Sequence, residues 1–260
     1  KSVAEHIDLS LKRLNTDHVD LFQFHQVAQE KDREAIYAPG GAMEAAVAAQ
    51  QAGKVRFIGV TSHSIPMAMK LIRTGDFISV QFPFNFIETE AADELHPLAR
   101  ELGVAIIGMK PFAGGAITDA SLAFKFLRSH ADLFPIPGYD SVESVEQVVS
   151  FYDAPNSASE KDFEEMAKVK AELGGEFCRR CEYCQPCPFG VAITGSMIYP
   201  LLASRMSPKV ASNFAAANLD TVPNCTECGV CVTRCPYTLP IPAMLKKHYE
   251  LYLEHRNAKE

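Results

Sequence analysis

The eight cysteines of this chain all fall in its last third, in two closely spaced runs. The first run is Cys178, Cys181, Cys184 and Cys187, and the second is Cys225, Cys228, Cys231 and Cys235. Each run ends in a Cys-Pro pair. The second run has the C-x2-C-x2-C-x3-C-P spacing with which bacterial ferredoxins hold [4Fe–4S] clusters, and the first differs by one residue before its last cysteine. The spacing predicts two [4Fe–4S] clusters, with all eight thiolates as ligands.

The proline after each run also predicts how the ligands are shared. In two-cluster ferredoxins the fourth cysteine of a run binds the cluster of the other run. We therefore expect a crossed arrangement, with Cys235 completing the site of the first run and Cys187 completing that of the second. Structural zinc and a disulfide framework are the alternatives. Zinc sites usually pair two CxxC units, and no cysteine or secretory signal precedes the first run, so both fit less well.

Composition limits the remaining classes. The 260 residues are 47% hydrophobic and 22% charged, which suits a soluble globular protein large enough for two domains. No apolar run approaches the ~18 residues of a membrane span, and reduced thiolates indicate the cytoplasm. The net charge is −7 without a basic stripe, so nucleic acid is not an expected partner.

From residue 2 to about residue 150, helical and strand patterns alternate, which predicts βα units and a parallel sheet. An amphipathic helix opens the chain, which begins with Lys1 rather than methionine, so we expect the chain to begin part-way through a domain. The predicted strands are 19–25, 55–62, 78–85, 104–110 and 133–137. The helices predicted after the opening one are 41–52, 66–74, 91–102, 121–129 and 142–152.

Two α/β architectures produce such strands: a doubly wound open sheet and a (β/α)8 TIM-type barrel. No Gly-x-Gly-x-x-Gly fingerprint follows a strand, so we expect a partial barrel of five βα units. Residues 153–160 are small and polar, and they mark a boundary between a domain at 1–156 and one at 157–260. The second domain is predicted to be mostly helical and ferredoxin-like.

Catalytic groups of a barrel gather at the carboxyl ends of its strands. His25 ends the first predicted strand, Thr61 and Ser62 the second, and Met109 and Lys110 the fourth. Amide and hydroxyl groups such as Gln81 and Ser62 would suit a planar carboxamide like that of nicotinamide. The alternatives are a histidine satisfied within the core, ordinary hydrogen bonding at loop ends, and a solvated lysine. His63 and His96 are interpreted as surface or packing residues.

Two segments resemble the aldo/keto reductase family. Residues 10–25 (SLKRLNTDHVDLFQFH) resemble the stretch entering its fourth strand, and residues 53–62 (GKVRFIGVTS) are similar to its fifth. Residues 136–138 and 141–143 resemble its eighth strand and following helix. The cysteine runs match a subgroup with a fused C-terminal two-cluster domain.

The resemblance implies a catalytic role for His25, as the histidine of an Asp-Tyr-Lys-His tetrad that orients a carbonyl. A tyrosine would donate the proton and NAD(P)H the hydride. It further implies that Thr61, Ser62 and Gln81 hold the carboxamide, with Met109 and Lys110 beside the ring. The strands carrying the other tetrad members would precede residue 1.

The resemblance leaves NAD or NADP open as the cofactor. Gly138 stands where many members have a lysine for the 2′-phosphate of NADP, and Val148 where many have an asparagine near the adenine. The predicted function is an oxidoreductase that couples carbonyl or alcohol chemistry on a small substrate to iron–sulfur electron transfer, with a redox carrier protein as a possible partner. The alternative is an electron-transfer or docking module whose barrel is not catalytic.

Overall fold

The computed structural model describes residues 2–173, 177–204 and 206–258 of the 260-residue chain. The chain divides into two compact units, Lys1–Ala167 and Lys168–Glu260. The division falls within helix α8 (Glu160–Leu173), where Lys125 of the first unit donates to Asp162 at 2.7 Å. The functional boundary at 156/157 stays a prediction.

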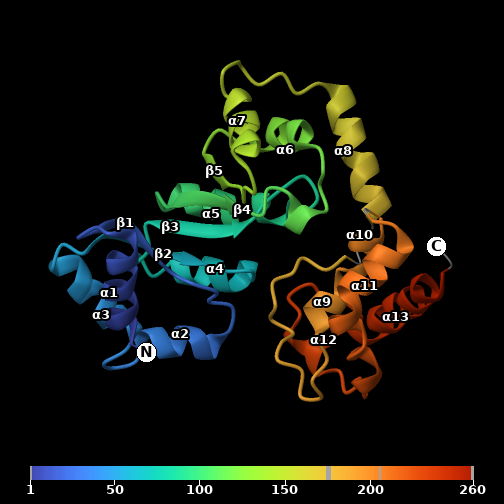
Figure 1. Ribbon diagram of the computed structural model, residues 1–260. Coiled ribbons are helices and arrows are strands. Elements are labelled where there is room, and N and C mark those ends of the chain that lie inside the picture. Colours follow the sequence, from blue (N-terminus) through green and yellow to red (C-terminus); the bar gives the residue numbers. More distant parts are fainter. Residues whose placement is uncertain (1, 174–176, 205, 259–260) are drawn as a thin grey trace. The chain divides into compact units, whose positions relative to one another are not determined.

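The first unit contains a five-stranded parallel sheet (Figure 1). Its strands lie in chain order, each hydrogen-bonded to the next, so every connection runs to an adjacent strand. This is the topology of a barrel wall and confirms the predicted fold class. The strands are β1 (Val19–Phe24), β2 (Val55–Thr61), β3 (Ser79–Pro83), β4 (Ala105–Met109) and β5 (Leu133–Ile136).

Helices connect these strands. They are α1 (Val3–Leu14), α2 (Glu30–Tyr37), α3 (Ala42–Gln51), α4 (Ile65–Ile72), α5 (Leu95–Glu101), α6 (Ala120–Leu127) and α7 (Val142–Ser150), with short 3-10 turns η1 (Glu90–Ala92) and η2 (Ala113–Gly115). Helix α2 was not predicted. The predicted helix 91–102 begins only at Leu95, because Pro97 lacks the N–H that a residue deeper in a helix would donate and is tolerated in the first turn.

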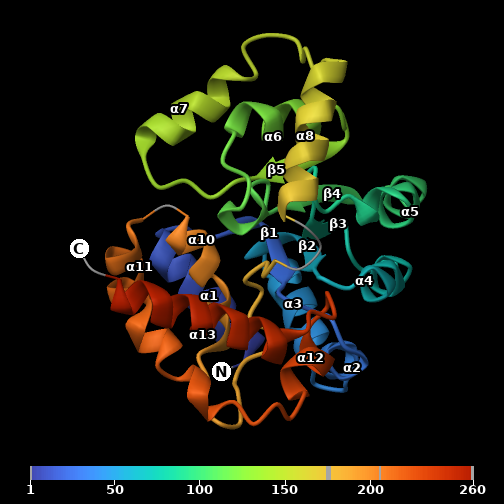
Figure 2. The same cartoon turned by 90° about the vertical axis from the view of Figure 1, so that its right-hand side faces the viewer.

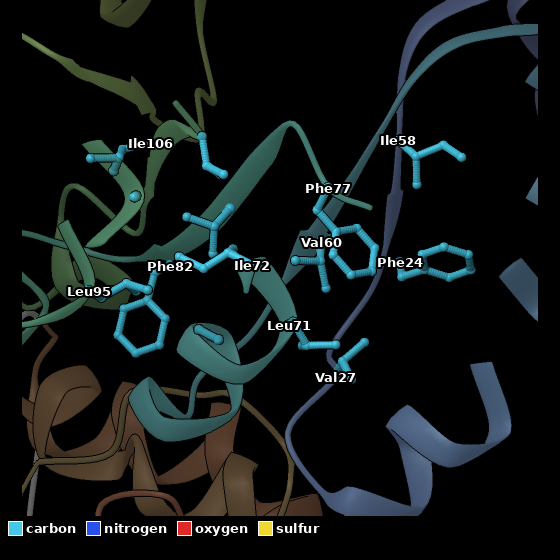
Figure 3. Packing of buried hydrophobic residues seen from close by; sticks show 14 of the residues in the cluster. Phe24, Val27, Ile58, Val60, Leu71, Ile72, Phe77, Phe82, Leu95 and Ile106 are labelled. Atoms are coloured by element: carbon cyan, nitrogen blue, oxygen red, sulfur yellow. The ribbon is translucent and has the colours of Figure 1, made fainter. Parts of the chain in front are cut away.

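The core of this unit lies between one face of the sheet and its helices. Alternate strand residues such as Phe24, Val60 and Phe82 point to this face and belong to one buried cluster with Leu71 of α4 (Figure 3). Phe24 meets Phe77 edge to face, with ring centroids 6.1 Å apart. Burial of each such side chain stabilises the fold by about 1.5–3 kcal/mol. The period-two alternation therefore fixes which residues remain for the opposite face.

The opposite face is the one that would line a barrel. Leu21, Gln23 and Gly59 of β1 and β2 lie on it, and farther along the sheet Phe134 and Ile136 of β5 are 69% and 38% exposed. The Gln23–Gly59–Ser79 row crosses three strands in register. Gly59 leaves room there for Ser79, because a Cβ at residue 59 would stand 2.2 Å from the Ser79 hydroxyl oxygen.

The second unit is built from helices around the cysteine segments (Figure 2). Its core joins Tyr199, Leu219, Leu245 and Tyr252, all fully or almost fully buried. Its elements are α9 (Ile193–Met197), α10 (Tyr199–Ala203), α11 (Pro208–Leu219), η3 (Val222–Asn224), α12 (Val230–Arg234) and α13 (Ile241–Asn257). Among the described residues, no helix is both long and apolar enough to cross a membrane.

Candidate functional site

His25 lies directly after β1 and is exposed. The next residue, Gln26, has a left-handed backbone (φ 63°), so the chain turns sharply once the histidine has been passed. The Gln26 N–H donates to Thr61 Oγ1 at 2.8 Å, and the Val27 N–H to the Thr61 carbonyl at 2.9 Å. The end of β2 therefore holds the loop that begins at His25.

Ser62 strengthens the same connection. It is fully buried, and its hydroxyl donates to the Val27 carbonyl at 2.7 Å while accepting from the Ser64 N–H at 3.1 Å. Thr61 is 4% exposed. Both hydroxyls are thus used in loop-end hydrogen bonds, the alternative that the sequence left open for Ser62. Their contact with a nicotinamide carboxamide stays a prediction.

Gln81 and Met109 lie close together on the sheet. Thr61 pairs with Gln81 across β2 and β3, and Gln81 Nε2 lies 3.5 Å from Met109 Sδ. Lys110 follows Met109 with a left-handed backbone (φ 56°), and its carbonyl accepts from Asn85 Nδ2 at 3.0 Å. The structure therefore groups Thr61, Gln81 and Met109, and it places Lys110 beside the loop after β3.

His25, His63 and Lys110 lie near the carboxyl ends of the strands, which we call the rim of the sheet. Burial, followed by electrostatic interactions with Lys110 and His25, lowers the pKa of His63 to about 3. His63 is therefore neutral at physiological pH, and the electrostatic influence of these two groups places them in its neighbourhood. The sequence analysis interpreted His63 as a surface or packing residue.

Sequence reasoning missed the turn formed by Asn85 and Glu88, both almost fully buried. Asn85 Oδ1 accepts from the N–H groups of Ile87 and Glu88, and Asn85 Nδ2 donates to Glu88 Oε2 at 3.1 Å. This Asx-type turn ends β3 at Pro83, two residues before the predicted end. An asparagine directly after an apolar strand was the available signal.

The cysteines of the second unit surround two neighbouring cavities. The first cavity is lined by Cys178, Cys181, Cys184 and Cys235. The second cavity is lined by Cys187, Cys225, Cys228 and Cys231, with Cys184 also reaching its wall. Each cavity therefore has cysteines of both runs. None of the eight forms a disulfide.

Hydrogen bonds tie the ends of the two runs together. Arg234, which precedes Cys235, donates from Nη1 to the carbonyl of Pro186 at 2.9 Å, and Pro186 precedes Cys187. The Cys187 N–H donates to Gln185 Oε1 at 3.1 Å. The segments that carry the two cysteines predicted to cross between the sites are thus linked by a hydrogen bond.

The donor set suits iron–sulfur clusters. Five cysteines and an otherwise largely apolar lining, including Ile193 and Leu245, surround the second cavity. Among the described residues, no three Cys, His, Asp or Glu side chains converge as ligands of a single ion do. The ligands of a [4Fe–4S] cluster instead surround a cavity that the cluster fills. Burial raises the pKa of Cys184 to about 11, so its binding to metal as a thiolate releases a proton.

Comparison with known proteins identifies both units. A model described as the aldo/keto reductase family matches residues 1–123, and a 4Fe-4S dicluster domain matches residues 177–240. Residues 1–123 are an aldo/keto reductase domain. Both resemblances stated from the sequence are confirmed, and the dicluster domain confirms the prediction of iron–sulfur clusters.

Curated relatives of the aldo/keto reductase domain are named as oxidoreductases. The uncharacterized oxidoreductase YrpG of Bacillus subtilis is 28% identical over 167 residues, which are 62% of this chain and 48% of that protein. The versiconal hemiacetal acetate reductase of Aspergillus parasiticus is 32% identical over 138 residues, 51% of this chain and 38% of that protein. The chain thus spans about half or less of these relatives.

Solved structures show the same fold. Aldo-keto reductase AKR11C1 from Bacillus halodurans superposes with a TM-score of 0.53 at 20% identity, covering 64% of this chain and 66% of that one. An aldo-keto reductase from Klebsiella pneumoniae in complex with NADPH gives a TM-score of 0.53 at 18% identity, covering 63% of each chain. At such identity the likeness concerns the fold of the aldo/keto reductase domain.

Proposed function

We propose that this chain belongs to an iron–sulfur oxidoreductase, in which an aldo/keto-reductase-type barrel works with a two-cluster electron-transfer domain. The observation that carries the proposal is the lining of the two cavities. The cysteines around each include the four of the crossed combination that a two-cluster ferredoxin requires, and Cys184 lines both. When bound, [4Fe–4S] clusters supply one-electron transfer. The protein's part is to hold the thiolates, exclude water with its apolar lining and fix the two sites side by side.

Paired cysteine variants test the ligand assignment. In protein purified without oxygen, Cys178→Ala/Cys235→Ala places both changes in the first cavity and should leave about four iron atoms per chain. Cys178→Ala/Cys187→Ala places one change in each cavity and should leave nearly none. If each run held its own cluster, the two results would be exchanged. Unmodified protein without visible absorption or iron would contradict the iron–sulfur proposal itself.

We further propose that the rim of the sheet is a nicotinamide-dependent site for a small carbonyl or alcohol substrate. His25 would orient the carbonyl oxygen, and Gln81, Met109 and Lys110 would lie beside the nucleotide. The proposal is supported by the exposed position of His25 at the carboxyl end of β1 and by the domain match. The NADPH in the Klebsiella pneumoniae structure supports the nucleotide assignment, with NAD or NADP left to measurement.

The test is carbonyl turnover by the whole protein with NADH and NADPH in turn. His25→Ala should lower kcat/KM by about tenfold or more, because a misplaced carbonyl loses proximity and proton transfer. His18→Ala is the matched control, since His18 is exposed and precedes β1 rather than following it. Equal turnover by the His25→Ala variant and the unmodified protein would contradict the role of His25.

One observation favours a second candidate, an electron-transfer or docking module with a non-catalytic barrel. The hydroxyls of Thr61 and Ser62 already bond to the loop after β1. Equilibrium binding of NADH or NADPH to the whole protein discriminates the two functions, because the docking module would bind neither. In both cases a redox carrier protein is the proposed partner and the cytoplasm the proposed location.

A further inference from the structure

Arg179 directly follows Cys178 in the first run, and its side chain is stacked against two aromatic rings. Its guanidinium carbon stands 4.2 Å from the ring centroid of Phe177 and 4.2 Å from that of Tyr237. Arg179 Nη1 also donates to the Phe177 carbonyl at 3.2 Å. Phe177 precedes the first run and Tyr237 follows the second, so the stacked cation joins the segments that provide Cys178 and Cys235. The planar guanidinium suits such stacking on aromatic faces.

Arg179 is also one of the residues that line the first cavity. We propose that Arg179 raises the reduction potential of the cluster in the first cavity, leaving that of the second nearly unchanged. The inference rests on the proposed clusters. Reduction adds negative charge to the cluster, and a fixed cation beside it stabilises the reduced form more than the oxidised one. Net charge near an iron–sulfur cluster is one of the quantities that set its potential.

The surrounding charges favour this assignment. Glu182 also lines the first cavity, but it is exposed, and water and salt screen its carboxylate more than they screen the partly buried guanidinium. Arg180, the neighbouring residue, is exposed and lines neither cavity. Apart from the cysteines, none of the described residues that line the second cavity has an ionisable side chain. The cation therefore distinguishes one site from the other.

A hydrogen bond acts in the same direction on the same site. Thr194 Oγ1 lies 3.9 Å from Cys184 Sγ. Once Cys184 is a thiolate ligand, only the threonine hydroxyl has a proton to donate. Hydrogen bonds to the sulfurs are a further determinant of cluster potential. Thr194→Val should therefore lower the first cluster's potential in addition to the effect of removing the cation.

The experiment is a redox titration followed by electron paramagnetic resonance in the whole chain. Arg179→Gln should shift the reduction equilibrium of one cluster by about tenfold toward the oxidised form, which is about 59 mV for a one-electron couple, and leave the other in place. Arg179→Lys should stay near the unmodified value, because it keeps the charge without the planar stacking. Arg180→Gln is the matched control and should move neither cluster appreciably.

Iron and sulfide analysis of every variant separates failure of the inference from failure of the proposed function. Absence of clusters from the unmodified chain would contradict the function and the inference with it. Loaded clusters whose potentials are the same in Arg179→Gln and the unmodified chain would overturn the inference alone. It would also be overturned if Arg179→Gln failed to load clusters, if Arg179→Lys shifted as far as Arg179→Gln, or if Arg180→Gln had an equal effect.

Discussion

Acid should destabilise the aldo/keto reductase domain through His96. This side chain is 1% exposed on α5, its ring centroid lies 4.6 Å from that of Phe84, and its Nε2 is buried without a hydrogen-bond partner among the described residues. Burial, with smaller effects of Arg100 and His130 and an opposing effect of Asp132, lowers its pKa from 6.5 to about 4. The folded domain therefore keeps His96 neutral.

The sign and size follow from proton binding. Below pH 6.5 His96 takes up a proton in the unfolded chain, whereas in the folded domain it does so only near pH 4. Between these values the unfolded state binds more protons than the folded state, so the free energy of unfolding falls as the pH falls. Between about pH 7.5 and about pH 5 this costs about 2 kcal/mol of the free energy of unfolding. The loss begins near the unfolded pKa and is complete only below the folded one.

Hydrogen exchange of the β3 amides measures the opening of this domain by itself. His96→Phe should reduce the loss on acidification by about 2 kcal/mol relative to the unmodified chain, because phenylalanine takes up no proton. His18→Gln is the control. Its hydrogen bond to Asp17 raises the pKa of His18, so removing this exposed histidine should leave the acid loss the same or slightly larger. An unchanged acid loss in His96→Phe would refute the reasoning.

Three further predictions concern packing and hydrogen bonds within the two units. Gly59→Ala should destabilise the first unit by about 1–3 kcal/mol in hydrogen exchange of β2, and adding Ser79→Ala should recover part of it by removing the nearest contact. Asp162→Ala should lower the stability of the first turn of α8 by about 1 kcal/mol, because it removes the carboxylate that accepts from Lys125 and from the Ser159 N–H. Hydrogen exchange in that turn should then be faster, and unchanged exchange there would contradict this. Tyr252→Phe should cost about 0.5–1.5 kcal/mol in exchange of α13, through loss of the 2.8 Å bond to Asp220.

The sequence predicted the strands well because their apolar character is local. The predicted strand 55–62 is Val55–Thr61, and the predicted strand 104–110 is Ala105–Met109. Helix α2 was missed because its apolar stripe is short: Ile36 is its only buried residue, and charged residues occupy most of the rest. Its start was nevertheless marked by Gln29 and Asp32, which bond reciprocally as a capping box.

The candidate site, like the fold, was predicted from the sequence only in part. Spacing alone predicted the eight cysteines, since thiolates that converge on a cluster must be close in the chain. Loop-end hydrogen bonding was an open alternative for Ser62, but the partners of the Thr61 and Ser62 hydroxyls were beyond sequence reasoning, because they lie 35 residues away in the loop after β1. For the same reason the stacking of Arg179 on Tyr237 has no signature in either cysteine run.

The shared wall between the two cavities has a consequence for electron counting. Cys184 and Ile193 each line both cavities, so clusters bound there would be separated by little more than one side chain. Each cluster carries a single reducing equivalent, whereas a hydride carries two electrons. Two clusters in such close contact form a reservoir with the capacity of one hydride. Under the proposed function, the domain would hold both electrons of one hydride at the same time.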